Sequence, residues 1–219
     1  MPFPNAAKGV KKLFTSEILA LIASGVTVIA LIMLVITGAA VEADSEGGTI
    51  FAGTGTIVLM AAASVLFTVA AIMALVGIIQ ASKDEGAFKS ALIAIGVSLV
   101  AAIVAAIFSS NGTVQSICQV VQNVMNICVT IFIIKGIINI ADKLKKTAVA
   151  TKGRDLLKII VCVYALSLIA SLVSLIFGGT FASIVTVILM LIATILNIVG
   201  YFLLLSLLNN GKKMLAKYN

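Results

Sequence analysis

Charged residues are missing from six long stretches of this chain. These stretches cover approximately residues 18–41, 54–81, 90–108, 114–134, 159–177 and 180–208. A helix of about 20 apolar residues, rising about 1.5 Å per residue, spans the roughly 30 Å hydrocarbon core of a bilayer. Runs of this length must satisfy every backbone hydrogen bond internally, which favours helices. The pattern therefore predicts an all-α, polytopic membrane protein with six transmembrane helices.

The composition agrees with this prediction. The mean hydropathy is +1.26 and 62% of the residues are hydrophobic, whereas soluble domains contain about 45–50%. The longest connector, approximately 141–158, is too short to bury a core of its own. Residues 17–219 are therefore expected to form one transmembrane domain, preceded by a separate segment at residues 1–16.

All fifteen Lys and Arg residues lie on one side of the predicted membrane. They occur before the first stretch, between the second and third, between the fourth and fifth, and after the sixth. The first connector on the other side instead carries Glu42, Asp44 and Glu46. The positive-inside rule places both termini in the cytoplasm and favours the cell membrane as the location. The cations flank a membrane and form no basic stripe interleaved with aromatic residues, so no nucleic-acid partner is expected.

The segment 1–16 mixes apolar and basic side chains. Val10, Leu13 and Phe14 lie among Lys8, Lys11 and Lys12. One interpretation is a short interfacial helix on the anionic cytoplasmic leaflet of the bilayer. The alternative is a solvated, basic flank with no contact of its own to lipid.

The chain also contains an internal repeat. Residues 20–27 and 91–98 are identical at six of eight positions, and Gly-Thr pairs recur at 53, 112 and 179. The stretch 90–108 also matches the stretch 159–177 without gaps, and this alignment pairs Lys89 with Lys158. We interpret the chain as three tandem helical hairpins, over approximately 13–83, 86–146 and 155–213. Because each unit has two spans, the copies share one orientation and can be related by an axis along the membrane normal.

The strongest candidate site is a row of polar side chains in the stretch 114–134, named here the polar stripe. Its members are Gln115, Gln119, Gln122, Asn126 and Thr130. At about 100° per residue, the four amides share an arc of about 60° on one helix face. Amides are costly in lipid unless they are paired, so the polar stripe must face protein or water.

The stretch 159–177 offers a facing row of small residues, named the small-residue stripe. It consists of Ser167, Ser171, Ser174 and Gly178, and this spacing allows helices to approach closely. Two interpretations stay open for the pair of stripes. They either hold two helices together or form a polar vestibule open to the outside.

Two further features have both a structural and a functional interpretation. Lys135 is the only ionisable residue placed inside a span, where it either snorkels to the headgroups or contacts an anion or lipid headgroup. Thr27, Ser98 and Ser167 occupy equivalent positions in the three repeats. They form a ring of hydroxyls if the odd helices line the repeat axis, or they are small packing residues.

Residue types needed for catalysis are missing from the spans. The chain has no His and no mid-membrane acid, and Cys118, Cys128 and Cys162 lack CxxC spacing. We therefore expect no enzyme activity, no metal and no cofactor. Two function classes remain: a channel, carrier or substrate-capture subunit for a small solute, or a non-transporting scaffold or accessory subunit that contacts anionic lipid or a cytoplasmic partner. A homo-oligomer or a membrane partner subunit is compatible with both.

Overall fold

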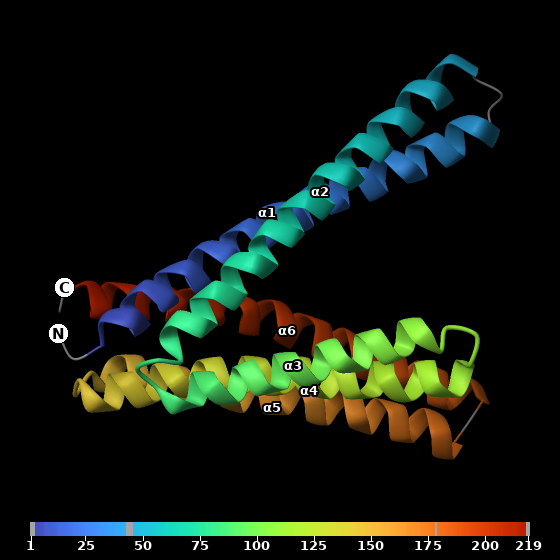
Figure 1. Ribbon diagram of the computed structural model, residues 1–219. Helices are drawn as coiled ribbons and strands as arrows, with labels where there is room; N and C mark the ends of the chain where they lie inside the picture. The colour runs from blue at the N-terminus through green and yellow to red at the C-terminus, as the bar shows by residue number, and fades with distance from the viewer. Residues whose placement is uncertain (1–2, 43–45, 178, 218–219) are drawn as a thin grey trace. The chain divides into compact units, whose positions relative to one another are not determined.

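The computed structural model describes the backbone of residues 3–42, 46–177 and 179–217, and the side chains of residues 3–35, 55–166, 169, 188–189 and 191–217. Within these residues the chain is helical and contains no strand. Six helices follow one another (Figure 1): α1 (Pro4–Glu42), α2 (Glu46–Ala81), α3 (Gly86–Ile107), α4 (Gly112–Lys143), α5 (Thr147–Phe177) and α6 (Gly179–Ala216).

Five of these helices contain segments long and apolar enough to cross a bilayer. Among the described residues, these segments are Pro4–Val35, Gly55–Ala81, Gly86–Ile107, Gly112–Lys143 and Leu191–Ala216. The predicted span 159–177 lies on α5, and most of its side chains from residue 167 onward fall outside the described residues. The chain is therefore a helical membrane protein with several membrane-crossing helices.

The described part of the N-terminal segment 1–16 is continuous with α1. From Pro4 it continues into α1 without a break, and proline suits the first position of a helix because its missing N–H would have no partner there. Ala6, Val10 and Leu13 are buried. Val10 and Leu13, two of the three apolar side chains expected to contact lipid, are thus buried within the protein. An interfacial position of this segment stays a prediction.

The chain divides into two compact units, residues 11–77 and residues 1–10 with 78–219. In the first unit, α1 and α2 each bury small residues seven positions apart: Ser16, Ala23 and Ala30 on α1, and Thr56, Ala63 and Ala70 on α2. A seven-residue spacing is typical of helices that wind around a partner with a left-handed twist. Small residues let such helices approach closely in a membrane. Gly55 of α2 shows this closeness, because a Cβ atom there would lie 3.2 Å from Cε of Met33 on α1.

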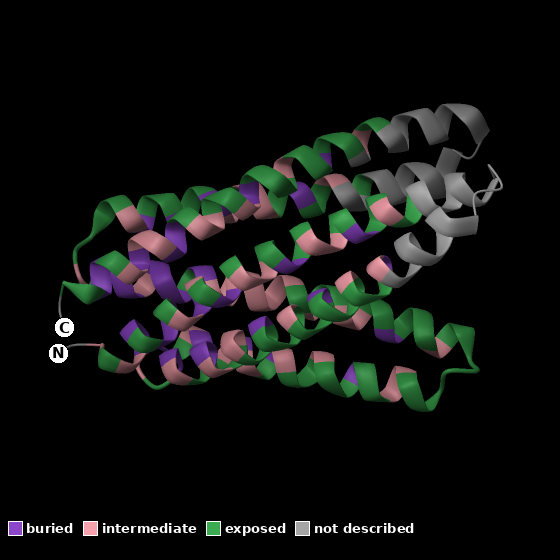
Figure 2. Ribbon diagram, turned by 90° about the horizontal axis from the view of Figure 1, so that it is seen from above, coloured by how far each residue is buried: buried purple, intermediate pink, exposed green. Residues whose placement is uncertain are grey.

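The second unit contains two hairpins, α3 with α4 and α5 with α6, and α4 also packs against α5 and α6. The same seven-residue spacing recurs at buried positions: Ala94 and Ala101 on α3, and Ala193, Gly200, Leu207 and Met214 on α6. Buried residues gather towards the end of the helices where both chain termini lie (Figure 2). This end of the second unit, where α3 and α5 begin and α4 and α6 end, is named the basic end.

Two glycines set the distances between helices near the basic end. A Cβ atom on Gly136 of α4 would lie 2.5 Å from Cε2 of Phe88 on α3. A Cβ atom on Gly153 of α5 would lie 2.5 Å from Cγ1 of Ile138 on α4. Real Cβ contacts are not this short, so glycine at both positions permits the observed packing of α4.

The turn between α4 and α5 is tight. Lys146 N donates to Ala141 O (2.8 Å) and Lys145 N donates to Asp142 O (3.0 Å), the hydrogen-bond pattern of a Schellman motif. Lys145 has a φ of 54°, a left-handed conformation in which glycine is the usual residue. A lysine therefore occupies a position of backbone strain between two helices.

Candidate functional site

α4 holds the polar stripe, and its first turn is fixed by Asn111. The Asn111 side chain accepts hydrogen bonds from Thr113 N (3.1 Å) and Val114 N (3.2 Å), so it caps the helix. The stripe follows directly. Its members differ in exposure: Gln115, Gln119 and Asn126 are exposed, whereas Gln122 and Thr130 are half-buried.

Most of the hydrogen-bonding capacity of the polar stripe is unused. Gln115 Nε2 donates to Ser109 O (3.0 Å), and Thr130 Oγ1 donates to Asn126 O (3.1 Å). The side chains of Gln119 and Gln122 make no hydrogen bond within the described part of the chain. An unpaired amide in hydrocarbon costs several kcal/mol (about 4–8 on a cyclohexane scale). These amides therefore need polar partners beyond the described part of the chain.

The polar stripe continues a face of α4 that is buried at its other end. Ile137 follows Gln119, and Ile140 follows Gln122, by eighteen positions, or five turns of about 3.6 residues. Ile137 and Ile140 are only 1% and 0% exposed. A Cβ atom on Gly211 of α6 would lie 3.5 Å from Cγ2 of Ile137. One face of α4 thus changes from apolar and packed towards α6 near the basic end to amide-bearing and exposed at the opposite end.

The other side of the same half of α4 is apolar. Ile117, Val120 and Val124 are 59%, 61% and 45% exposed, and they lie roughly 120–180° around the helix from the centre of the polar stripe. Exposed apolar side chains suit contact with lipid tails. This half of α4 is therefore divided into an apolar side and an amide side.

Lys135 lies on the apolar side. It follows Ile117 by eighteen positions, so the two share a line along the helix. Its side chain is exposed. A long side chain with a charged tip can reach from an apolar surface to the headgroups, and the headgroup or anion contact of Lys135 stays a prediction.

The structure brings together only part of the predicted site. The side chains of Ser167, Ser171 and Ser174, and Gly178, lie outside the described residues, so the small-residue stripe cannot be placed against α4. Of the predicted hydroxyl ring, Thr27 Oγ1 donates to Ala23 O (2.9 Å) and Ser98 is half-buried. These two residues belong to different units, and the ring stays a prediction.

One polar cluster is not predicted by the sequence pattern. Glu85, in the connector between α2 and α3, accepts hydrogen bonds from Asn139 Nδ2 (2.9 Å) and Lys143 Nζ (2.5 Å) of α4. Burial raises the pKa of the Glu85 carboxyl, but these two hydrogen bonds and the positive charge of Lys143 outweigh it and hold the pKa below its ordinary value. Glu85 therefore joins the connector to the end of α4.

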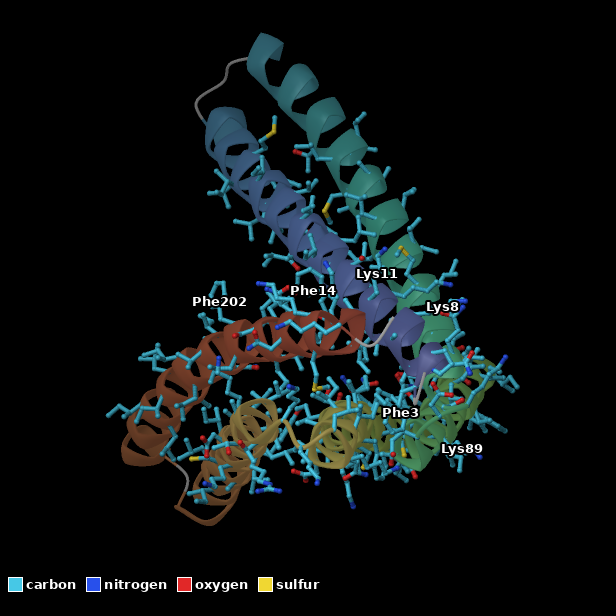
Figure 3. The ribbon with its side chains drawn as sticks, turned by 90° about the vertical axis from the view of Figure 1, so that its left-hand side faces the viewer. Phe3, Lys8, Lys11, Phe14, Lys89 and Phe202 are labelled. Carbon is cyan, nitrogen blue, oxygen red and sulfur yellow. The ribbon has the colours of Figure 1, made fainter. Side chains whose placement is uncertain are left out.

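The neighbouring acid holds the start of α1. Asp84 accepts hydrogen bonds from Asn5 Nδ2 (2.9 Å) and Ala6 N (2.7 Å), which satisfies a free N–H of the first turn of α1. Phe3, labelled in Figure 3, places its ring 5.7 Å from Lys143 Nζ, within cation–π range. The sequence signal for this cluster is the pair of acids, Asp84 and Glu85, between Lys83 and Lys89.

The remaining candidate chemistry is sparse. Cys118, Cys128 and Cys162 are free thiols, and among the described residues no three His, Cys, Asp or Glu side chains are grouped as metal ligands. The distinctive feature of the chain is therefore the exposed amide face of α4. Comparison with known protein families, with curated proteins and with solved structures finds no match for this chain.

Proposed function

We propose that this protein is a channel, carrier or substrate-capture subunit for a small polar solute, and that the polar stripe lines a water-filled vestibule open to the outside. One observation carries the proposal. The face of α4 that packs against the protein near the basic end bears exposed amides at the opposite end. Water or solute at this face would satisfy groups that lipid cannot.

The chemistry of the polar stripe indicates the class of solute. Amides donate and accept hydrogen bonds without carrying charge, and the stripe contains no Asp, Glu, Lys or Arg. A neutral, hydroxyl- or amide-bearing solute is the best match, since an ion would lose its hydration without a compensating charge. The chain has no His, so the proposed transport is not coupled to proton transfer through a histidine.

The proposal also includes six spans arranged as three hairpins with both termini in the cytoplasm of a cell. Burial at equivalent repeat positions supports the hairpins. Alignment of the Gly-Thr pairs brings Ala81, Ile140 and Leu207 into register, and all three are buried. Ala94 and Ala101 of α3, which are buried, correspond to buried Ala23 and Ala30 of α1. The one-sided distribution of Lys and Arg supports the orientation.

A second function fits the exposure of the same amides. Gln119 and Asn126 are exposed on one helix face, so a helix of another membrane protein, or of a second copy, could pair with them. Interhelical hydrogen bonds of this kind stabilise contacts between membrane helices. The protein would then be an accessory subunit or scaffold, with the polar stripe as its interface.

Thiol accessibility tests the vestibule. In a variant with Cys118, Cys128 and Cys162 replaced by Ala, Gln122→Cys is treated in sealed vesicles with a membrane-impermeant thiol reagent. Labelling from the outer side supports the vestibule, and Val120→Cys on the apolar side is the matched control that should stay unlabelled in lipid. If Gln122→Cys stays unlabelled and instead cross-links to another chain, the accessory-subunit function replaces the transport function.

A further inference from the structure

The basic end of the second unit contains a cavity with four lysines around it. The cavity is open to solvent on one side and has a volume of about 340 Å³. Lys146 directly precedes α5 and Lys152 lies near its start, whereas Lys213 lies at the end of α6 and Lys217 is the residue beyond it. The start of α5 and the end of α6, which belong to one hairpin, thus bring cationic side chains around one space.

The described carboxylates of this part of the chain are engaged elsewhere. The four acids between residues 78 and 217 are all bound elsewhere: Asp84 to Asn5 and Ala6, Glu85 to Asn139 and Lys143, Asp142 to Arg154, and Asp155 to Lys158. Within the described residues, none of the four cavity lysines forms an ion pair. Four like charges around one cavity repel each other, and an anion between them would relieve this repulsion.

The first turn of α5 adds to the positive potential. Lys146 precedes the helix, and Ala148 and Val149 of its first turn line the cavity. Val149 N donates to Lys146 O (3.1 Å) in this turn, and the helix dipole is positive at this end. Helix starts with nearby lysines are suited to phosphate groups.

The walls of the cavity are partly apolar. Val149 and Met214 line it together with the lysines, and Asn210 supplies an amide. A soluble anion gains little from the apolar walls, whereas the glycerol and first acyl carbons of a lipid would contact them. Basic pockets between membrane helices are known to bind anionic headgroups in general.

From these observations we infer that the cavity at the start of α5 and the end of α6 binds a phosphate group, and that this group belongs to the headgroup of an anionic lipid. The site lies at the opposite end of α4 from the polar stripe and does not depend on the proposed transport of a solute. Phosphatidic acid is the sharpest probe, because a phosphomonoester carries about −1.5 to −2 charges near neutral pH.

The experiment uses the full chain in nanodiscs of phosphatidylcholine with graded amounts of phosphatidic acid, and lipid binding is measured by native mass spectrometry and by the shift in unfolding temperature. The cavity variant is Lys146→Gln with Lys213→Gln. The matched control, Lys83→Gln with Lys89→Gln, removes the same charge from exposed lysines that do not line the cavity. We expect about 10- to 30-fold weaker binding in the cavity variant and less than 3-fold change in the control.

Three further arms make the result decisive. Lys146→Arg with Lys213→Arg should restore binding, and the cavity variant should unfold at the wild-type temperature in phosphatidylcholine alone, since all four lysines are exposed. If glycerol 3-phosphate stabilises the wild type and not the cavity variant, the phosphate site is supported with a soluble source in place of a lipid. Equal weakening in the cavity and control variants, or absence of binding to either phosphate compound, would overturn the inference.

Discussion

The ring of Phe88 on α3 occupies the space where a side chain at position 136 of α4 would lie. A Cβ atom on Gly136 would be 2.5 Å from Phe88 Cε2, and Phe88 is fully buried. A buried ring held between helices has little room to move, because protein interiors are closely packed. The packing of the α3–α4 hairpin therefore depends on the absence of a side chain at position 136.

Replacement of Gly136 by Ala should destabilise the protein by about 1–3 kcal/mol, the usual cost of overpacking a filled core. The measurement is the unfolding free energy in detergent micelles. Gly96→Ala on α3 is the matched control, because a Cβ atom there would meet nothing within 4 Å. It should be neutral or stabilising by up to about 1 kcal/mol, since alanine favours a helix. Equal stability of the two variants would contradict the packing of Phe88 on Gly136.

Glu85 makes the stability of the protein sensitive to acid. Its pKa in the folded state lies below the ordinary value of 4.5, so protonation is less favourable in the folded state than in the unfolded state. The resulting stabilisation is complete above about pH 4.5 and is lost as the pH falls through the folded pKa. Below that pH the carboxyl no longer attracts Lys143.

We expect Glu85→Gln to be less stable than the wild type at pH 7 by about 1–3 kcal/mol, because a charge-assisted hydrogen bond is lost, and the difference should shrink between about pH 5 and pH 3. Unfolding temperatures recorded across this range provide the test. Asp155→Asn, which removes an ion pair between exposed side chains, should follow the wild-type pH curve. A constant difference between Glu85→Gln and the wild type across this range would contradict the assignment.

The helices are largely predictable from the sequence, but their ends are not. The apolar run 18–41 predicts the C-terminal part of α1, which ends at Glu42, yet the helix begins at Pro4. The helix extends this far because residues such as Lys8 and Lys11 are good helix formers. For the same reason α5 begins at Thr147, well before the apolar run that starts near residue 159. Apolar runs indicate the part of a helix that crosses the hydrocarbon core. Residues with high helical propensity on either side extend the helix beyond that part.

The sequence predicts which residues of the polar stripe share a helix face, but it does not predict which other residues pack against that face. The spacing of Gln119 and Gln122 fixes their common face, whereas their exposure depends on where other helices pack, which no local pattern contains. The cluster of Glu85, Asn139 and Lys143 joins residues more than fifty positions apart. The lysine cavity likewise forms only because the start of α5 and the end of α6 lie side by side, which the sequence pattern does not show.

The strained turn at Lys145 predicts a substitution that stabilises the protein, in contrast to Gly136→Ala and Glu85→Gln. Its φ of 54° is unfavourable for a residue with a Cβ atom. Lys145→Gly should therefore stabilise the protein by about 0.5–1 kcal/mol in chemical unfolding. Lys145→Ala removes the same charge and keeps the Cβ atom, so it should bring no gain. A similar gain in both variants would attribute the effect to charge.

The proposed orientation predicts which connectors are accessible from each side. In the variant without native cysteines, Thr151→Cys near the start of α5 should react only after the membrane is made permeable, and Ser110→Cys before α4 should react in sealed cells. Both side chains are exposed in the structure, so burial in protein does not limit labelling. Labelling of Thr151→Cys from outside would reverse the orientation derived from the positive-inside rule.

The final prediction concerns the polar stripe itself. If Gln119, Gln122 and Asn126 hold helices together, their replacement by Leu should cost about 0.6–2 kcal/mol for each interhelical hydrogen bond lost. If they line a vestibule, the same replacements should leave stability nearly unchanged, within about 0.5 kcal/mol. The absence of hydrogen bonds from Gln119 and Gln122 within the described residues favours the second result. Val124→Leu on the apolar side is the control and should affect neither stability nor labelling.

Hydration can be measured before any solute is known. Gln122→Cys should react from the outer side at a slow rate, because the flanking Val121 and Met125 are half-buried and narrow the approach. Adding Gln119→Leu and Asn126→Leu should exclude water and slow this reaction by at least about tenfold, since a thiol reacts only as the hydrated thiolate. An unchanged rate would show that these amides do not keep the face wet. No reaction at all, with a large loss of stability in the Leu variants, would instead establish the polar stripe as a contact between helices.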